Sequence, residues 1–446
     1  MTGTLPDGPR EPAALQTARF LSRPFGSLDR AYERYGPVFT VNLWPVGRMV
    51  LLADPDAVKA VWSRDRVNTL PSGRDVLLRP LLGPRSLLLQ EGEEHLRRRK
   101  LMLPPFHGER MRGYLETMRE ATERDMARWP VGRPFPLMER TQAITLDVIL
   151  RAVFGTTGGP REDELRTLLR DILNWSVGFR ANVMLALAQK PELLMRTQLG
   201  KLVARADQVL HAEIEERRRA DDLEEREDIL SLLVLARDED GEGLSKEELR
   251  DQLMTLLAAG HETTATGLAW AFDALFRHPA VMERLRDELA SDDDAYLQAV
   301  VQETLRVRPV VPEVGRVAGE ETRVNGHVLP AGTPTLASVQ LIHRRADIYP
   351  EPLAFRPERF LDDKPATYSW IPFGGGTRRC IGAAFAELEM RVVIRTILER
   401  AELLPGSDRA EPPARRPVTM APANGTPALL ASAVRPRAES VSAVAA

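Results

Sequence analysis

Apolar residues recur every three to four positions along most of the chain, which is the spacing of amphipathic α-helices. This period is nearly continuous from about residue 114 to 236, and the apolar stretch 145–154 ends at Gly155, a residue suited to a helix C-terminus. The β-rich runs are short, with a predicted hairpin at 38–43 and 49–52, further strands at 323–329 and 333–339, and weak strands within 401–430. The pattern therefore predicts a mainly α protein with small β-sheets.

The longest predicted helix begins at a capping box, in which Ser245 is followed three residues later by Glu248, and it ends near His278 before a proline. Some thirty residues at a rise of 1.5 Å give roughly 50 Å, enough to cross the whole protein. The middle of this helix reads Ala-Gly-His-Glu-Thr-Thr (259–264), although glycine and threonine are poor helix-interior residues. A close helix crossing explains the small residues, whereas an acid in the same turn indicates a functional site.

Other segments are assigned from turn and cap signals. Short helices are expected at 25–35, 54–62, 281–290 and 296–307. Three prolines and two glycines within 67–89 predict a long loop. The ends, about 1–18 and 431–446, are expected to be flexible because they are small, polar and contain proline.

Composition narrows the class of protein. The 61 Lys and Arg nearly balance the 64 Asp and Glu, so the net charge of -3 does not suggest nucleic acid as a partner. One cysteine excludes a disulfide framework or a thiolate-cluster zinc site and fits a reducing compartment. The N-terminal residues lack the apolar run of a signal peptide or membrane anchor, and no internal repeat is visible, so we expect a single cytoplasmic domain over 1–446 without a membrane anchor.

That cysteine lies in the stretch 369–382, Ser-Trp-Ile-Pro-Phe-Gly-Gly-Gly-Thr-Arg-Arg-Cys-Ile-Gly. Cys380 stands where a glycine-rich loop enters a predicted helix, and unpaired N–H groups of the first turn, with Arg378 and Arg379, favour negative charge on its sulfur. Such a thiolate is either a nucleophile or a metal ligand, and an inert buried thiol is the alternative. A phosphate loop is a weak reading because the Gly-Lys-Ser/Thr ending is missing.

The spacing of Phe373, Gly376, Arg378, Cys380 and Gly382 resembles the haem-binding signature of the cytochrome P-450 family. The resemblance implies that Cys380 is the thiolate axial ligand of haem iron. It further implies the fold of that family, a triangular prism with haem b (iron protoporphyrin IX) between a long distal helix and a proximal helix. Gly374 belongs to the same cofactor-binding loop.

The segment 259–264 is similar to the distal motif of this family. The resemblance implies that Glu262 and Thr263 are catalytic, delivering protons beside bound dioxygen, and that Ala259, Gly260 and Thr264 lie against the cofactor.

Basic residues upstream and downstream resemble the family's partners of the haem propionates. They are His95 and Arg99, one helical turn apart and followed by Phe106, together with Arg316 and Arg378. A solvated basic face is the alternative reading of the first two. The neighbouring Arg97, Arg98 and Lys100 are expected to point elsewhere and to offer a basic proximal face to a ferredoxin-type redox partner.

Two further groups follow from position within the family. Glu303 and Arg306, with Arg359 of the Pro-Glu-Arg-Phe segment, are expected to be structural and to hold the cysteine loop. The residues expected to line the substrate pocket are Trp175, Phe179, Leu256, Ala259, Val310, Val311, Glu313 and Val314. Trp175 and Phe179 are either core or lid residues, and Glu313 either selects a polar or cationic group or pairs with a nearby arginine.

The resemblance implies a monooxygenase that hydroxylates an unactivated C–H bond of a lipophilic molecule, such as a terpenoid, steroid or fatty acid, with O2. No fused reductase is visible, so NAD(P)H electrons are expected through an external ferredoxin and ferredoxin reductase. The alternatives are a haem-thiolate isomerase, dehydratase or peroxygenase, a non-catalytic haem sensor, and a cysteine hydrolase.

Overall fold

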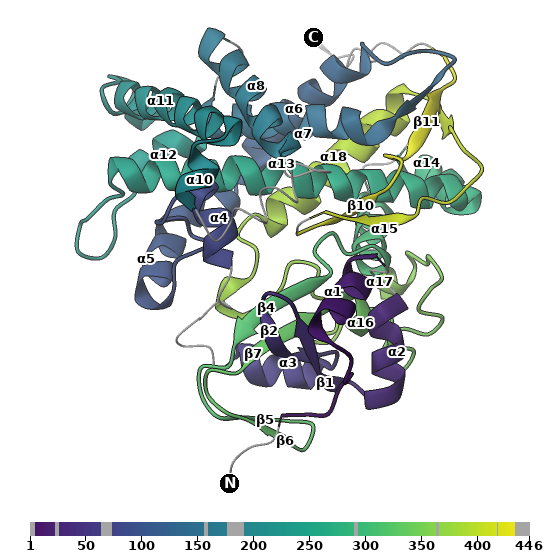
Figure 1. Cartoon of the computed structure of the whole chain (residues 1–446). Coiled ribbons are helices and arrows are strands. Elements are labelled where there is room, and N and C mark those ends of the chain that lie inside the picture. Colours follow the sequence, from purple (N-terminus) through teal and green to yellow (C-terminus); the bar gives the residue numbers. More distant parts are fainter. Residues whose placement is uncertain are drawn as a thin grey trace.

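The computed structural model describes residues 5–22, 26–63, 74–155, 159–175, 191–289, 293–362, 365–416 and 418–432. Helices make up the larger part of the molecule, and four small sheets occupy the remainder (Figure 1). This confirms the predicted fold class. Phe179, one of the predicted pocket residues, lies outside the described residues.

The helices occupy most of the sequence between residues 55 and 307. They are α1 (Ala13–Ser22), α2 (Gly26–Tyr35), α3 (Pro55–Trp62), α4 (Arg74–Leu82), α5 (Gly92–Met102), α6 (Arg110–Met126), α7 (Leu137–Phe154), α8 (Pro160–Asn174), α10 (Pro191–Met195), α11 (Gln198–Arg218), α12 (Ile229–Leu235), α13 (Lys246–Arg277), α14 (Pro279–Leu289), α15 (Ala295–Val307), α16 (Val339–Ile342), α17 (Arg359–Asp362) and α18 (Ala383–Arg400). Short 3-10 helices are η1 (Pro104–Phe106), η2 (Leu223–Glu225) and η3 (Gly376–Arg378).

The strands form one four-stranded sheet and three smaller ones. They are β1 (Val38–Leu43), β2 (Gly47–Leu52), β3 (Pro134–Pro136), β4 (Glu313–Val317), β5 (Thr322–Val324), β6 (His327–Leu329), β7 (Pro334–Ser338), β8 (Leu403–Pro405), β9 (Pro413–Arg415), β10 (Met420–Pro422) and β11 (Pro427–Leu430). The largest sheet has the order β1-β2-β7-β4, with only the β2–β7 pair parallel. The β5–β6 hairpin turns at Asn325 and Gly326, both with positive φ, as the Asn-Gly pair predicts.

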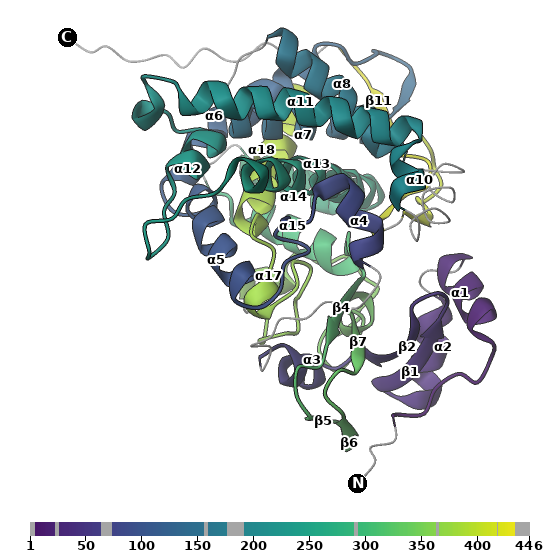
Figure 2. The same cartoon turned by 60° about the vertical axis from the view of Figure 1, so that its left-hand side comes forward.

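Helix α13 is the centre of the helical part. Its 32 residues cross that part in Figure 1 and are seen nearly end-on, surrounded by other helices, in Figure 2. Both halves of the predicted capping box form between Ser245 and Glu248. The helix packs closely on α7 and α18, since a Cβ on Gly260 would lie 3.3 Å from Ile149 and one on Gly267 would lie 3.1 Å from Met390. The glycines therefore set how near these helices approach.

One expectation about an irregular segment is wrong. Residues 74–82, expected to be loop, form α4, because the run Arg-Asp-Val-Leu-Leu-Arg sustains a helix with Pro80 in its last turn. The described N-terminal residues dock on the edge strand β1, where the Thr40 N–H donates to the Asp7 carbonyl (3.1 Å) and α1 follows directly.

Candidate functional site

The glycine-rich loop brings Cys380 to the N-terminus of α18. Gly374 and Gly376 adopt positive φ angles of 69° and 63°, which favour glycine. A Cβ on Gly375 would lie 2.8 Å from the Tyr368 ring, so this loop also packs too tightly for a side chain there. The Cys380 N–H donates to the Phe373 carbonyl (2.9 Å), closing the loop immediately before the helix, whose N-cap is Gly382. The backbone thus fixes the direction in which the thiol points.

Cys380 is accessible to solvent, yet protein atoms surround it on most sides. This burial raises the pKa of the Cys380 thiol, while the Gly382 N–H, Arg379 and Arg99 lower it. The sequence predicted the charge-stabilising groups correctly but not that desolvation outweighs them. The thiol therefore needs a further positive charge, such as a metal ion, to become a thiolate at neutral pH.

The loop rests on an ion-pair network whose central pair is fully buried. Arg306 donates to both carboxylate oxygens of Glu303 (2.6 and 2.8 Å), and both side chains are completely buried. Arg359 adds a third charge at 3.1 Å from Glu303. These residues, with His343, are called the proximal lock below.

His343 joins the lock to the cysteine loop. Its Nε2 accepts the Ile371 N–H (2.9 Å), so its Nδ1 carries the proton and donates to the Arg306 carbonyl (3.2 Å). Burial, and secondarily the Arg306 charge, lower the pKa of His343 to about 3, so the ring is neutral. Sequence reasoning missed this residue, because nothing in its local pattern distinguishes it.

The segment 259–264 forms the accessible middle of α13, which is buried on both sides of it. Ala259 is exposed, and the Thr263 hydroxyl donates to the Ala259 carbonyl (2.7 Å). Thr264 is buried and donates to the Gly260 carbonyl (3.1 Å). Both threonines therefore hydrogen-bond back to helix carbonyls, while Thr263 shares the open face of the turn with Ala259.

Glu262 is held from outside its own helix. Gln142 of α7 donates to its Oε2 (2.6 Å), and Arg416, which follows β9, forms an ion pair with its Oε1. Thr145 of α7 also donates to the His261 carbonyl (3.0 Å). Gln142 and Arg416 lie 120 and 154 residues away in the sequence, so no local signal could have identified them.

A buried acid on α18 reaches the same turn. Glu389 is 1 % exposed, and burial raises its pKa well above the usual range. It hydrogen-bonds with the Thr264 hydroxyl. This contact ties the helix that follows Cys380 to the accessible turn of α13.

Four predicted cofactor-binding bases gather near the cysteine loop. Burial, followed by the charges of Arg378, Arg99 and Arg316, lowers the pKa of His95 to about 3, which shows that all four groups lie together. Arg378 donates to the Gln90 carbonyl, and Arg316 lies with its guanidinium carbon 5.4 Å from the centre of the Trp62 ring. Phe106 packs on Phe385 of α18, with ring centres 6.1 Å apart. The cluster is suited to bind carboxylate groups.

The three bases expected to face a redox partner are paired within the chain. Arg98 is buried against Glu248 (2.7 Å), Arg97 donates to Asp238 (2.6 Å), and Lys100 contacts Glu239 at 2.8 Å. Acids of the loop before α13 and of the first turn of α13 therefore neutralise this face, and the placement of the three bases does not support the docking role expected of them.

The predicted pocket residues have diverse surroundings. Leu256 and Val310 belong to the main core, and Trp175 packs against it at the end of α8. Val314 packs beside a smaller hydrophobic cluster formed largely by β1, β2 and α3, and Val311 is half-buried. Glu313 pairs with Arg415 at 2.9 and 3.2 Å, so of the two readings left open its pairing with an arginine is the one seen.

The residues around Cys380 fit a haem group. Among the described residues no cluster of three or more His, Cys, Asp and Glu side chains could hold a metal ion. A single cysteine is the protein ligand that haem iron takes in haem-thiolate proteins. The four clustered bases match its two propionates, and the glycines leave room for a close approach.

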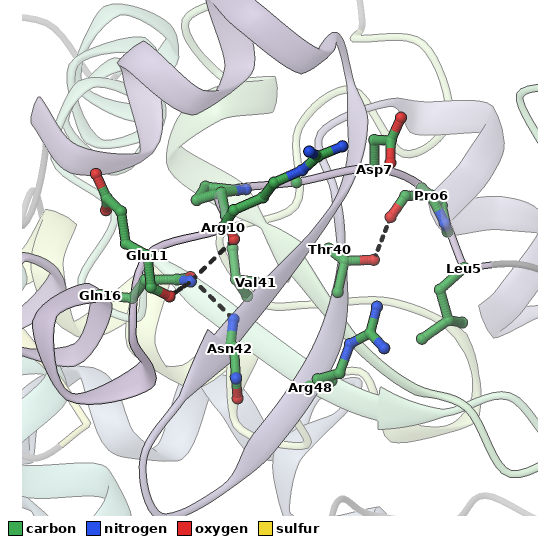
Figure 3. A pocket seen from close by; sticks show the side chains of 12 residues that line it. Leu5, Pro6, Asp7, Arg10, Glu11, Gln16, Thr40, Val41, Asn42 and Arg48 are labelled. Carbon is green, nitrogen blue, oxygen red and sulfur yellow. Dashed lines mark hydrogen bonds between the residues drawn. The ribbon is translucent and has the colours of Figure 1, made fainter.

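A cavity of about 290 Å³ lies elsewhere, between the N-terminal segment and β1 (Figure 3). Gln16 spans it, donating to the Pro9 and Glu11 carbonyls (3.1 and 2.9 Å). None of the predicted site residues lines it. The Asn42 N–H of β1 donates to Gln16 (3.0 Å) and the Thr40 hydroxyl donates to the Pro6 carbonyl (2.6 Å), and these bonds attach the N-terminal segment to the sheet.

The chain is similar to known proteins over most of its length. The family model described as cytochrome P450 matches residues 12–427. Cytochrome P450 135B1 of Mycobacterium tuberculosis is 41% identical over 438 residues, covering 95% of this chain and 92% of its own, and cytochrome P450 137 of the same organism is 38% identical over 415 residues, covering 93% and 87%. A solved cyanobacterial structure, CYP120A1 with retinoic acid bound, superposes with a TM-score of 0.79 at 26% identity, covering 96% of this chain and 99% of its own.

In the part of the chain that the structure describes, no helix combines the length and apolar character needed to cross a bilayer.

Proposed function

Because the chain belongs to the cytochrome P450 family and is therefore a haem monooxygenase, we propose that it hydroxylates an unactivated C–H bond of a lipophilic small molecule, such as a terpenoid, steroid or fatty acid. One observation carries the proposal, namely the accessible turn with Ala259 and Thr263 in the middle of an otherwise buried helix. The solved relative named above was crystallised with retinoic acid, a lipophilic molecule, which supports the same substrate class.

Haem, when bound, supplies the oxygen activation and C–H oxidation. Cys380 would hold its iron, and His95, Arg99, Arg316 and Arg378 would hold its propionates. As a thiolate, Cys380 would make that iron electron-rich, which suits it to the oxygen activation that the cofactor would supply.

The residues of the accessible turn move protons. The Thr263 hydroxyl, bonded to the Ala259 carbonyl, can rotate to donate to a ligand on the open face. Glu262 can exchange protons with water once its ion pair with Arg416 opens. Ala259, without a polar side chain, leaves this face apolar toward the substrate.

Electrons are proposed to come from NAD(P)H through a separate ferredoxin reductase and ferredoxin. Exposed bases near the cysteine loop suit an acidic partner better than the paired bases of α5 do. They are Arg379, beside the ligand, and Arg110 and Arg112 on α6, whose Tyr114 packs on Phe385 with ring centres 5.2 Å apart. We expect Arg112→Glu to weaken ferredoxin-dependent reduction, with Arg119→Glu on the same helix as the control.

The experiment that tests the proposal is an isotope-labelled turnover assay. The haem-loaded protein, NADPH, ferredoxin and ferredoxin reductase are incubated under ¹⁸O2 with terpenoids, steroids and fatty acids. Incorporation of one ¹⁸O atom into a product is expected. Product formation without O2 would favour an isomerase, turnover with peroxide alone would favour a peroxygenase, and a loaded protein that oxidises no member of the panel would contradict the proposed substrate class.

A further inference from the structure

Two consecutive arginines join the C-terminal hairpin β9–β10 to two different acids. Arg415 binds both oxygens of Glu313 on β4, and only 9 % and 5 % of these side chains are exposed. Arg416 reaches Glu262 on α13 through a single N–O contact, and 25% and 17% of these side chains are exposed. The first pair is a buried bidentate anchor, whereas the second is open to exchange.

The hairpin backbone next to Arg416 is fixed. The Arg416 N–H donates to the Thr419 carbonyl (2.9 Å), and the Met420 N–H donates to the Val310 carbonyl (2.8 Å). The indole of Trp270 on α13 donates to the Met420 carbonyl (2.8 Å). The Arg416 side chain therefore extends from a rigid base, which is a property of a binding residue rather than of a mobile surface arginine.

The position of Glu262 places the Arg416 guanidinium at the accessible turn. Glu262 and Thr263 are the i+3 and i+4 neighbours of Ala259, so Ala259 lies between them on the surface of α13 and Glu262 borders the accessible turn. Apart from Glu262, the one acceptor found for the Arg416 guanidinium in the described part of the chain is the sulfur of Met138 at 3.7 Å. A guanidinium has five donors, so N–H groups remain from which an incoming carboxylate can begin to displace Glu262.

We propose that Arg416 binds the carboxylate of the substrate, which makes lipophilic monocarboxylic acids the preferred substrates of this enzyme. The proposal rests on the monooxygenase function above and refines its substrate class. A substrate carboxylate replaces Glu262 on Arg416 by forming the fork-shaped pair that guanidinium favours. Glu262 then retains Gln142 as its partner and becomes free to exchange protons at the turn that carries Thr263. The binding of substrate therefore also releases Glu262 from Arg416.

Binding titrations of the haem-loaded protein test this proposal. The probes are straight-chain carboxylates from octanoate to octadecanoate and the primary alcohols of the same lengths, followed by the substrate-induced shift of the haem absorption. At least one acid is expected to bind more tightly than its matched alcohol. Arg416→Gln should weaken the binding of that acid about 10-fold or more, which is the effect expected from the loss of a charged hydrogen bond. The affinity for the matched alcohol should not change.

Glu262→Gln should have the opposite effect and strengthen the binding of the carboxylate probe, because the competing carboxylate is removed. Arg205→Gln, which deletes an exposed ion pair with Glu164 on α8, is the matched control and should change the affinity for neither probe. Should Arg416→Gln fail to fold, Glu262→Gln decides the question alone, since it retains Arg416.

Three results would overturn the proposal: no acid binds more tightly than its alcohol, Arg416→Gln weakens both ligands equally, or Glu262→Gln fails to tighten the acid. Failure of the proposed function is distinguishable. In that case the wild-type protein would incorporate no ¹⁸O from ¹⁸O2 into any compound of the panel above, whereas failure of this inference alone leaves that incorporation intact.

Discussion

The two sides of the site are both organised by a glutamate–arginine pair, but the pairs differ in burial. On the side of Cys380, Glu303 and Arg306 are completely buried, and Glu303 also binds Arg359 and the Arg356 N–H (2.8 Å). On the side of Thr263, Glu262 and Arg416 keep 17% and 25% of their side chains exposed. A buried pair with every oxygen engaged holds one geometry, whereas a partly exposed pair can open at little cost. The loop that carries Cys380 is therefore rigid, and the turn that carries Thr263 is adjustable.

The largest expected effect comes from breaking the proximal lock. Glu303→Gln leaves Arg306 and Arg359 without a counter-charge in the interior, which should cost about 3–5 kcal/mol of folding free energy. Glu262→Gln should cost less than about 1 kcal/mol, because its pair is partly hydrated. Denaturant unfolding of both variants measures the contrast. Equal losses would show that the two pairs do not differ as described.

An intermediate effect is expected from pH. Burial lowers the pKa of His343 to about 3 and, at α13, that of His261 to about 4, both below the ordinary value of 6.5. Between these values the unfolded chain binds more protons than the folded chain, so the stability that each neutral ring contributes is present above pH 6.5 and is lost as the pH falls. From pH 7 to pH 5 the free energy of unfolding should fall by about 2 kcal/mol for each histidine.

His343→Gln sharpens this prediction for the proximal side. The amide can still accept the Ile371 N–H but does not titrate, so the pH-dependent loss should shrink by about one histidine's share. Denaturant unfolding at pH 7 and pH 5 measures the difference. A variant with the same pH dependence as the wild type would show that His343 is not the buried neutral group described here.

The smallest effect on stability, but a clear functional one, is expected at the distal turn. Thr263 is accessible, and the hydrogen bond that its hydroxyl makes among the described residues goes back to its own helix, so Thr263→Ala should leave the unfolding midpoint nearly unchanged. The variant should instead release most electrons as hydrogen peroxide rather than as hydroxylated product. The ratio of product to NADPH consumed measures this. A ratio equal to that of the wild type would remove Thr263 from proton delivery.

The sequence predicted those features that depend on local patterns. The capping box at Ser245, the helix end at Gly155 and the Asn325-Gly326 turn all formed, because each depends on neighbours within a few residues. The cysteine loop and the 259–264 segment were found because their residues are contiguous. The helix α4 was missed, since Pro80 and the surrounding glycines outweighed a short run of helix-forming residues.

The partners that set the behaviour of the site could not be predicted. Arg416, Gln142 and His343 act through contacts with residues 28 to 154 positions away, which only the folded chain brings together. The same limit applies to the thiol of Cys380. Its local sequence indicates a lowered pKa, and only the packing around it shows that desolvation prevails.

The central claim is that Cys380, presented by a rigid loop, is the protein ligand of haem iron. Absorption spectroscopy of Cys380→Ser, reduced and treated with carbon monoxide, tests it most directly, with Thr377→Ser in the same loop as the control. The wild type and the control should show the red-shifted band that a thiolate ligand produces, and Cys380→Ser should lose it. An unchanged band in Cys380→Ser would contradict the account.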